Sequence, residues 1–343
     1  MLQIRCEGSP YQIGTAHGRA AKEAIGRSID FYERVFRERT GMGWASVEQV
    51  AMEYMPLVLR HRDIFEEVQG VAHGSGFNVG AIMAINARTE IMYGLMDEGC
   101  TTLAWKPAAG GSWLAQNWDW QVGQKENLVV LDVAPSGGRP RYKIVTEAGL
   151  IGKIGLNEAG VGVCFNAIQA RGVDTDSMPA HVGLKLVMES RSREEAVKRL
   201  ETLGIGSACT ITIADPTGGV ALECSARGIE RIEMDDRGRV FHSNHFLKPQ
   251  EGVFDTQMPA DTLARLARII ELADDLEGEP TVDKIRDLFK DEQGFPASIC
   301  RMNTSENVNA TLFNIVMDLQ KKEALVSVGR PVAPEGELWL RFD

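Results

Sequence analysis

Cys100 is the residue whose neighbours point most directly to chemistry. It follows Gly99 and opens a stretch in which apolar residues change from helical to alternating, strand-like spacing. A thiol at this place can attack the carbonyl of the preceding residue, and Gly99 has no side chain to block the approach. Hydrolysis of the resulting thioester would make Cys100 a new N-terminus. We therefore predict self-cleavage between Gly99 and Cys100.

A newly exposed Cys100 would carry a nucleophile and a base together. The pKa of a free α-amino group is roughly 7.7–8.0, so this amine can accept the proton of the thiol on the same residue. The alternative is that Cys100 is an ordinary core cysteine, because free cysteine is among the most buried residue types.

Two histidines, His242 and His245, lie close together after a predicted strand. They suggest either a metal site or a Cys-His pair, but no third ligand stands at a suitable spacing, so we predict no metal. An unprocessed hydrolase that uses Cys100, His245 and Asp119 as a triad is the alternative mechanism.

The parts of the chain that must position these residues show two different patterns of apolar residues, one before Cys100 and one after it. Residues 1–99 are rich in amphipathic helical patterns, which predict a helical cover over the site. From Cys100 onwards, short alternating runs separated by Gly and Pro predict strands, with two pairs of helices between them. Predicted strands before the first of those pairs cover 101–105, 113–118, 128–133, 142–146, 149–154 and 161–166. The pattern alone supports an α+β class, and no polar linker marks a second domain, so 1–343 is predicted to be one domain.

Composition excludes several classes of partner. The net charge of −11 argues against a nucleic-acid surface, which needs concentrated Lys and Arg. No run of 18 apolar residues is present, and the first residues lack a secretory signal, so neither a membrane span nor secretion is expected. The six cysteines are dispersed, which favours a reducing compartment.

Several segments resemble the fungal isopenicillin N acyltransferase family of N-terminal-nucleophile cysteine hydrolases. The first three are 86–90, 99–102 and 116–119, and the others are 146–149, 151–153, 243–245, 298–301 and 310–315. The similarity extends from Leu2 to Phe342. It implies a four-layer αββα fold, in which two stacked antiparallel sheets are covered by helices, and a zymogen cleaved into chains 1–99 and 100–343.

The resemblance also implies roles for the reacting groups. It makes Cys100 the nucleophile and places Asp119 near the new amine, where a carboxylate can hold or orient an ammonium. It implies that the Asn244 side chain donates a hydrogen bond to the oxyanion. Loss of such a donor raises the activation free energy by roughly 2.7–4 kcal/mol in other hydrolases. Without the resemblance, a local turn role for Asp119 would be favoured.

Three further residues receive roles from the same likeness. Arg301 is expected near the substrate, where a guanidinium can bind a carboxylate through two hydrogen bonds. Asn166 is expected, by looser similarity, to hold the substrate amide or the oxyanion. Thr102 is expected to assist self-cleavage through its hydroxyl. A surface arginine is the ordinary alternative for Arg301.

The predicted function is a self-processing cysteine amidohydrolase or acyltransferase. An amide or thioester, penicillin-like or an N-acyl amino acid or peptide, would acylate Cys100, and water or an amine would receive the acyl group. No cofactor is expected, acyl-CoA stays open as a co-substrate, and the 1–99 fragment is the expected partner chain. The ending Arg341, Phe342, Asp343 is unlike a peroxisomal signal, which favours the cytoplasm. A non-catalytic binding protein that keeps the fold is the remaining alternative.

Overall fold

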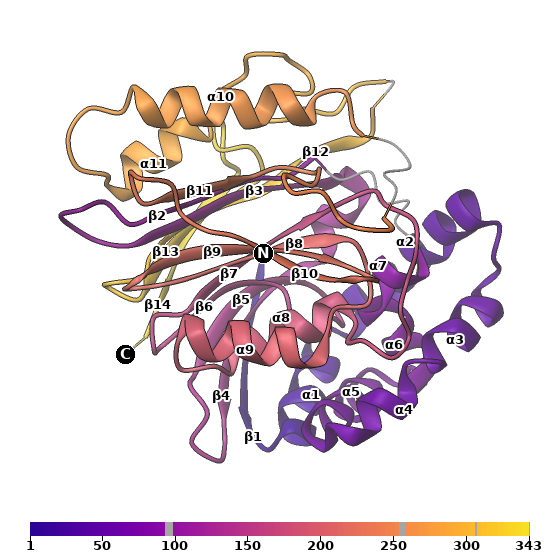
Figure 1. Ribbon diagram of the computed structural model, residues 1–343. Coiled ribbons are helices and arrows are strands. Elements are labelled where there is room, and N and C mark those ends of the chain that lie inside the picture. The colour runs from indigo at the N-terminus through magenta and orange to yellow at the C-terminus, as the bar shows by residue number, and fades with distance from the viewer. Residues whose placement is uncertain (93–98, 254–257, 306, 343) are drawn as a thin grey trace.

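Four layers make up the computed structural model: helices, sheet, sheet, helices (Figure 1). It describes residues 1–92, 99–253, 258–305 and 307–342. Helices α10 and α11 cover the outer face of one sheet, and α8, α9, α1 and α5 lie beyond the other (Figure 1). The αββα arrangement implied by the resemblance is therefore confirmed.

The helices fall into the groups that the sequence predicted. In the first part of the chain they are α1 (Pro10–Ala20), α2 (Lys22–Thr40), α3 (Trp44–Met52), α4 (Met55–Arg60), α5 (Arg62–Ser75), α6 (Val79–Asn86) and α7 (Arg88–Ile91). Later come α8 (Ala180–Met188), α9 (Arg193–Leu203), α10 (Thr262–Asp274) and α11 (Val282–Leu288). No helix among the described residues is long and apolar enough to cross a membrane.

Both sheets are built mainly from sequence neighbours joined by tight turns. Within the described residues the eight-stranded sheet has the order β1-β4-β5-β6-β7-β8-β9-β10, and the six-stranded sheet has the order β11-β2-β3-β12-β13-β14. The first sheet contains β1 (Leu2–Gly8), β4 (Leu128–Pro135), β5 (Tyr142–Glu147), β6 (Ile154–Asn157), β7 (Gly162–Ala167), β8 (Cys209–Asp215), β9 (Gly218–Ser225) and β10 (Gly228–Ile232). The second contains β2 (Thr101–Trp105), β3 (Trp113–Gln121), β11 (Arg239–His242), β12 (Asn309–Asp318), β13 (Glu323–Val328) and β14 (Gly336–Arg341).

Two details of the predicted sheets are wrong. The first sheet is not purely antiparallel, because β1 pairs parallel to β4. The run 149–154 is not a strand, and β6 starts only at Ile154. Gly149 has a φ of 94°, in the left-handed region, and its carbonyl accepts a hydrogen bond from Asn86 Nδ2 at 2.9 Å. Apolar alternation predicted a strand there, but a distant side chain holds the backbone in a turn.

Helix α1 begins at a capping box and packs closely on α5. Ser9 accepts a hydrogen bond from the backbone N–H of Gln12, whose side chain accepts from the Ser9 N–H. Gly14 and Gly18 face the backbone of α5 so closely that a Cβ on Gly14 would lie 2.1 Å from the carbonyl oxygen of Glu67. Glycines therefore allow this close approach of the two helices.

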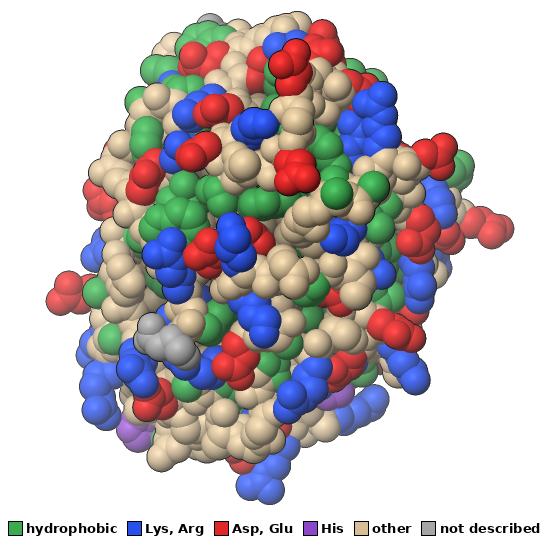
Figure 2. Space-filling view, turned by 90° about the vertical axis from the view of Figure 1, so that its left-hand side faces the viewer, with side chains coloured by type: hydrophobic (Ala, Val, Ile, Leu, Met, Phe, Trp, Pro, Cys, Tyr) green, Lys and Arg blue, Asp and Glu red, His purple; other side chains and the backbone are tan. Residues whose placement is uncertain are grey.

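The main core joins the residues before and after Cys100. Its buried side chains include Ile25, Phe36 and Ile85 from the first part of the chain and Trp118 and Phe165 from the strands. The first 99 residues therefore depend on the sheets for burial of their apolar faces. On the outside, the face in Figure 2 shows Lys and Arg side chains lying among Asp and Glu side chains.

Candidate active site

Cys100 lies directly before β2 and is fully buried. Strand β2 pairs with β3, which brings Asp119 of β3 beside it. The backbone N–H of Asp119 points to Cys100 Sγ at 3.5 Å, and Sγ lies 3.8 Å from the Asp119 carbonyl oxygen. The thiol predicted to react thus lies against the backbone of Asp119.

The Asp119 side chain is buried between a hydroxyl and a guanidinium. Thr311 Oγ1 of β12 donates to Oδ1 at 2.7 Å, and Arg301 Nε lies 3.5 Å from Oδ2. Burial raises the pKa of Asp119 to about 7, although Arg301 and Arg265 favour its charged form. A carboxyl group of this kind can exchange a proton near neutral pH.

Arg301 connects Asp119 to the proposed cleavage point. Its side chain is only 6% exposed and also pairs with Asp261. It packs on Gly99: a Cβ added there would lie 2.3 Å from Arg301 Nε and 2.6 Å from Cζ. A side chain at position 99 would therefore require the Arg301 guanidinium to shift.

Asn244 follows β11, and its amide group is fixed from both ends. Nδ2 donates to the carbonyl oxygen of Ala167 at 2.8 Å, and Oδ1 accepts from Arg265 Nη2 at 2.9 Å. The backbone N–H of Asn244 donates to Thr262 Oγ1 at 2.9 Å. Since Nδ2 carries two hydrogens, one donor direction is left for another acceptor.

Arg265 of α10 is the residue that the sequence did not suggest. Its Nη1 donates to the Cys100 carbonyl oxygen at 2.6 Å and to Thr101 Oγ1 at 3.1 Å. Its Nε donates to Asp261 at 2.6 Å, and Nη2 holds Asn244. One buried guanidinium thus links the Cys100 backbone to the predicted oxyanion donor. The only local signal was the Asp261–Arg265 spacing of four, which suits a helical ion pair.

Thr102 and Asn166 meet across the two sheets. Thr102 Oγ1 of β2 donates to Asn166 Oδ1 of β7 at 2.7 Å, and Gln116 Nε2 donates to the same oxygen at 3.2 Å. The Nδ2 of Asn166 is buried without a hydrogen-bond partner among the described residues. Asn166 therefore keeps an amide donor for a ligand, while Thr102 orients that amide.

The two histidines form separate local contacts. His242 Nε2 lies 2.8 Å from Glu223, whereas His245 Nδ1 lies 3.0 Å from Thr262 Oγ1 and 3.2 Å from Ser243 Oγ. Burial lowers the pKa of His245 to about 4. These contacts do not join His245 to Cys100 or Asp119 as the triad alternative requires. Across the described ranges, no three His, Cys, Asp or Glu side chains are grouped to hold a metal ion.

Three of the resembling segments form a buried ionic cluster rather than part of the Cys100 site. Glu147 pairs with Lys153 at 2.8 Å and with Arg88 of α7 at 3.2 Å. Burial alone would raise the pKa of Glu147, but the two cations outweigh it and lower the pKa to about 2. Lys153 Nζ also lies 4.1 Å from the ring centre of Trp118, next to Asp119. The cluster ties the first part of the chain to the strand that carries Asp119.

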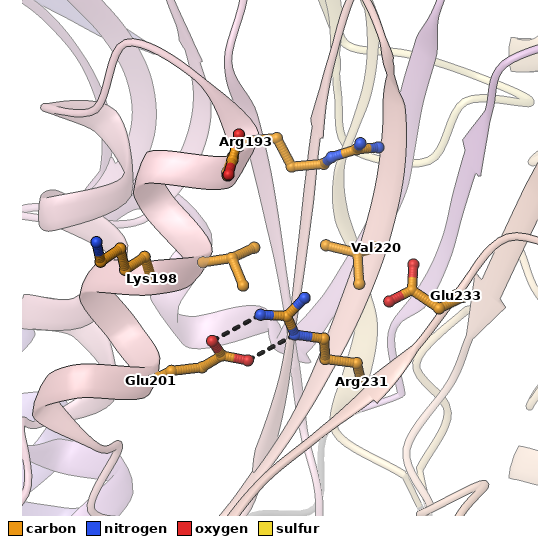
Figure 3. A pocket seen from close by; sticks show the side chains of 8 residues that line it. Arg193, Lys198, Glu201, Val220, Arg231 and Glu233 are labelled. Carbon is orange, nitrogen blue, oxygen red and sulfur yellow. Dashed lines mark hydrogen bonds and ion pairs between the residues drawn. The ribbon is translucent and has the colours of Figure 1, made fainter.

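An open pocket of about 410 Å³ lies elsewhere, between α9 and strands β9 and β10 (Figure 3). Arg231 and Glu201 join across it through hydrogen bonds of 2.6 and 2.7 Å. Its charged lining residues alternate in sign: Arg193, Glu194, Lys198, Glu201, Arg231 and Glu233. Neither Cys100 nor its contacts Asp119 and Arg265 line this pocket.

Comparison with known proteins agrees with the resemblance. The sequence profile of the acyl-coenzyme A:6-aminopenicillanic acid acyl-transferase family matches residues 106–333. The chain is 34% identical to the acyl-coenzyme A:6-aminopenicillanic-acid-acyltransferase 40 kDa form of Emericella nidulans, with 100% of this chain and 96% of that protein covered.

Two solved structures are more distant. A Caenorhabditis elegans N-acylethanolamine-hydrolyzing acid amidase ortholog matches with a TM-score of 0.48 and 15% identity, covering 64% of this chain and 93% of that one. Penicillin V acylase from Agrobacterium tumefaciens matches with a TM-score of 0.41 and 16% identity, covering 71% and 86%. The profile match over residues 106–333 and the match to the Emericella relative over the whole chain decide the relationship: this chain belongs to the acyl-coenzyme A:6-aminopenicillanic acid acyltransferase family.

Proposed function

We propose that this protein is a self-processing N-terminal-nucleophile cysteine enzyme that cleaves an amide or thioester through an acyl-Cys100 intermediate. The observation that supports it most is the group around Cys100: the backbone N–H of Asp119 points to the thiol, and Arg265 binds both the Cys100 carbonyl and Asn244. Membership of an acyltransferase family supports acyl transfer as the overall reaction.

Self-cleavage would start with attack of the Cys100 sulfur on the Gly99 carbonyl carbon. The peptide C–N bond breaks as the thiol proton passes to the nitrogen, leaving a thioester and a free amine. Water then cleaves the thioester to a Gly99 carboxylate and a Cys100 thiol. Asp119 supports these steps because its pKa of about 7 lets it take and return a proton at neutral pH.

In turnover the free amine of Cys100 would act as the base for its own thiol. The sulfur attacks the substrate carbonyl, Asn244 donates to the oxyanion, and the Cys100 ammonium protonates the leaving group. Asn166 offers its free amide donor to the substrate, and Arg301 offers a charge for a substrate carboxylate. Water or an amine then releases the acyl group.

The substrate class that we propose is suggested by the name of a relative. The name of the Emericella relative describes an acyl-coenzyme A and 6-aminopenicillanic acid. We propose the same kind of pair for this chain, an acyl-CoA thioester as donor and a small amine as acceptor, with hydrolysis of penicillin-like or N-acyl amino acid amides as the competing reaction.

Denaturing mass spectrometry of the purified protein tests the proposal. We expect fragments of 99 and 244 residues from the wild-type chain of 343, and one intact chain from Cys100→Ala. Processed protein should release 6-aminopenicillanic acid from penicillins or acylate it from acyl-CoA. Fully active protein of unbroken length would refute the proposal and favour a hydrolase without processing. An unchanged biological effect in Cys100→Ala would instead favour a binding protein.

A further inference from the structure

Another open pocket lies beside the end of the strand that carries Asp119. Its volume is about 510 Å³, and small-molecule sites commonly measure about 300–1,000 Å³. Helix α2 forms one wall, and the other is formed by the start of a short 3-10 helix (Val122–Asn127) and by the residue before β12. We call it the Arg34 pocket after one of its main lining residues, which are Phe31, Arg34, Glu38, Arg39, Val122 and Val308.

The Arg34 pocket continues the two strands of the candidate active site. Gln121, which also lines it, is the last residue of β3 and follows Asp119 by two residues, about 7 Å along a strand. The Val122 N–H donates to the Val308 carbonyl oxygen at 3.0 Å, just beyond the pairing of β3 with β12. Since the Asp119 N–H points to Cys100 Sγ, only a short stretch of strand separates the pocket from the thiol.

The charge of this pocket favours an anion, although the protein as a whole is acidic. Arg34 and Arg39 line it with one carboxylate, Glu38, whereas the chain has a net charge of −11. Neither arginine forms an ion pair with the described residues, while Arg37 on the same helix pairs with Glu33 at 2.6 Å. Two guanidinium groups without carboxylate partners at one pocket can bind phosphate groups.

Apolar groups complete the lining. The Arg34 guanidinium lies over the Phe31 ring, with Cζ 5.5 Å from the ring centre, and Gly123 packs against both side chains. This contact holds the guanidinium in place and leaves its N–H groups available to an anion. Val122 and Val308 are exposed there and offer apolar contact to a heterocyclic ring. The lining therefore suits a ligand that combines phosphate groups with an aromatic base.

We propose that the Arg34 pocket binds the nucleotide end of an acyl-CoA donor, with Arg34 and Arg39 pairing with its phosphate groups. Because the proposed function supplies the thioester donor, this assignment rests on that function. Coenzyme A carries its sulfur at one end of a flexible pantetheine arm and its phosphates and adenine at the other. Its nucleotide must therefore lie beside the reacting centre, and not in it, when the thioester reaches Cys100.

Isothermal titration calorimetry with coenzyme A itself tests this on the purified wild-type enzyme without turnover. At low salt, Arg34→Gln and Arg39→Gln should each weaken binding by about fivefold, and the double variant by about 25-fold. Arg37→Gln, the control on the same helix, should bind as wild type does. Glu38→Gln removes the opposing carboxylate and should tighten binding by about two- to fivefold, a gain that misfolding does not produce.

Kinetics separate the nucleotide from the reacting bond. The substrates compared are hexanoyl-CoA and the hexanoyl thioester of N-acetylcysteamine, which has the same thioester and no nucleotide. The double variant of Arg34 and Arg39 should raise the KM for hexanoyl-CoA by about 25-fold and leave the KM for the short thioester unchanged.

Three results would overturn the assignment: no binding of coenzyme A to wild type, equal binding by wild type and the double variant, or an equal rise of KM for both thioesters. Each of them leaves self-cleavage and amide hydrolysis standing. Failure of the proposed function shows in a different measurement, as active protein of unbroken length in denaturing mass spectrometry.

Discussion

Replacing Arg265 by lysine tests whether one guanidinium positions the oxyanion donor. The substitution keeps the positive charge beside Asp261, but a lysine ammonium lacks the planar fork that reaches Cys100 O and Asn244 Oδ1 together. The Asn244 amide would then lose the contact that sets its orientation, while its bond to Ala167 remains.

The size of the effect follows from the bond that is lost. A hydrogen bond to a charged group contributes about 1.5–3 kcal/mol, and about 1.4 kcal/mol corresponds to a tenfold change in rate. We expect Arg265→Lys to lower kcat by about 10- to 100-fold. Removal of the donor itself in Asn244→Ala should cost more, about 100- to 1000-fold. Arg268→Lys, on the same helix, should stay near wild type.

The assay compares kcat of processed enzymes, with thermal unfolding to check that each variant is folded. A double variant of Arg265→Lys and Asn244→Ala distinguishes positioning from a separate role. If Arg265 acts through Asn244, the lysine change should add little once the amide is gone. The reasoning would be refuted if the effects of the two substitutions on kcat were fully additive, or if kcat of Arg265→Lys stayed within about twofold of wild type.

Other perturbations have equally definite outcomes. Asp119→Asn removes a carboxyl group with a pKa of about 7, so self-cleavage of freshly translated chain should slow about 100-fold and lose its inflection near that pH. Glu147→Gln removes the buried carboxylate charge that pairs with Arg88 and Lys153, which should lower the free energy of unfolding by about 3–5 kcal/mol at neutral pH. The pKa of Glu147 in the folded protein is about 2, below the ordinary 4.5, so the stability difference between wild type and Glu147→Gln should shrink as the pH falls from 4.5 towards 2. Urea unfolding measures it, and a difference that stayed constant with pH would contradict a charged, paired Glu147. Gly14→Ala should destabilise the chain by about 1–3 kcal/mol through overpacking against α5, whereas Gly26→Ala, within α2 and near only a flexible ring, should be close to neutral in thermal unfolding.

Local signals were enough to predict the α+β class of the fold and to single out Cys100 as a candidate nucleophile. The start of α1 at Ser9-Pro10 depends on capping within a few residues, and the strands after Cys100 depend on alternation and turns. The four-layer order came from the resemblance, because alternation shows which face is buried and not which strands become neighbours.

The candidate site divides in the same way. Cys100, Asp119, Asn244, Arg301 and Asn166 were found from residue type and resemblance, and the structure brings them into one region. Their roles stay predictions until the experiments above are done.

The sequence by itself determined that Gly99 precedes Cys100 at the point where helical spacing of apolar residues changes to strand-like alternation. Only the tertiary structure decided what surrounds that bond: Arg265 reaches the Cys100 carbonyl from 165 residues away, and the pKa of Asp119 rises because packing buries its side chain. Capping and alternation act over a few residues and can be read along the chain. Burial and long-range hydrogen bonds depend on how distant segments pack, so no local sequence pattern predicts them.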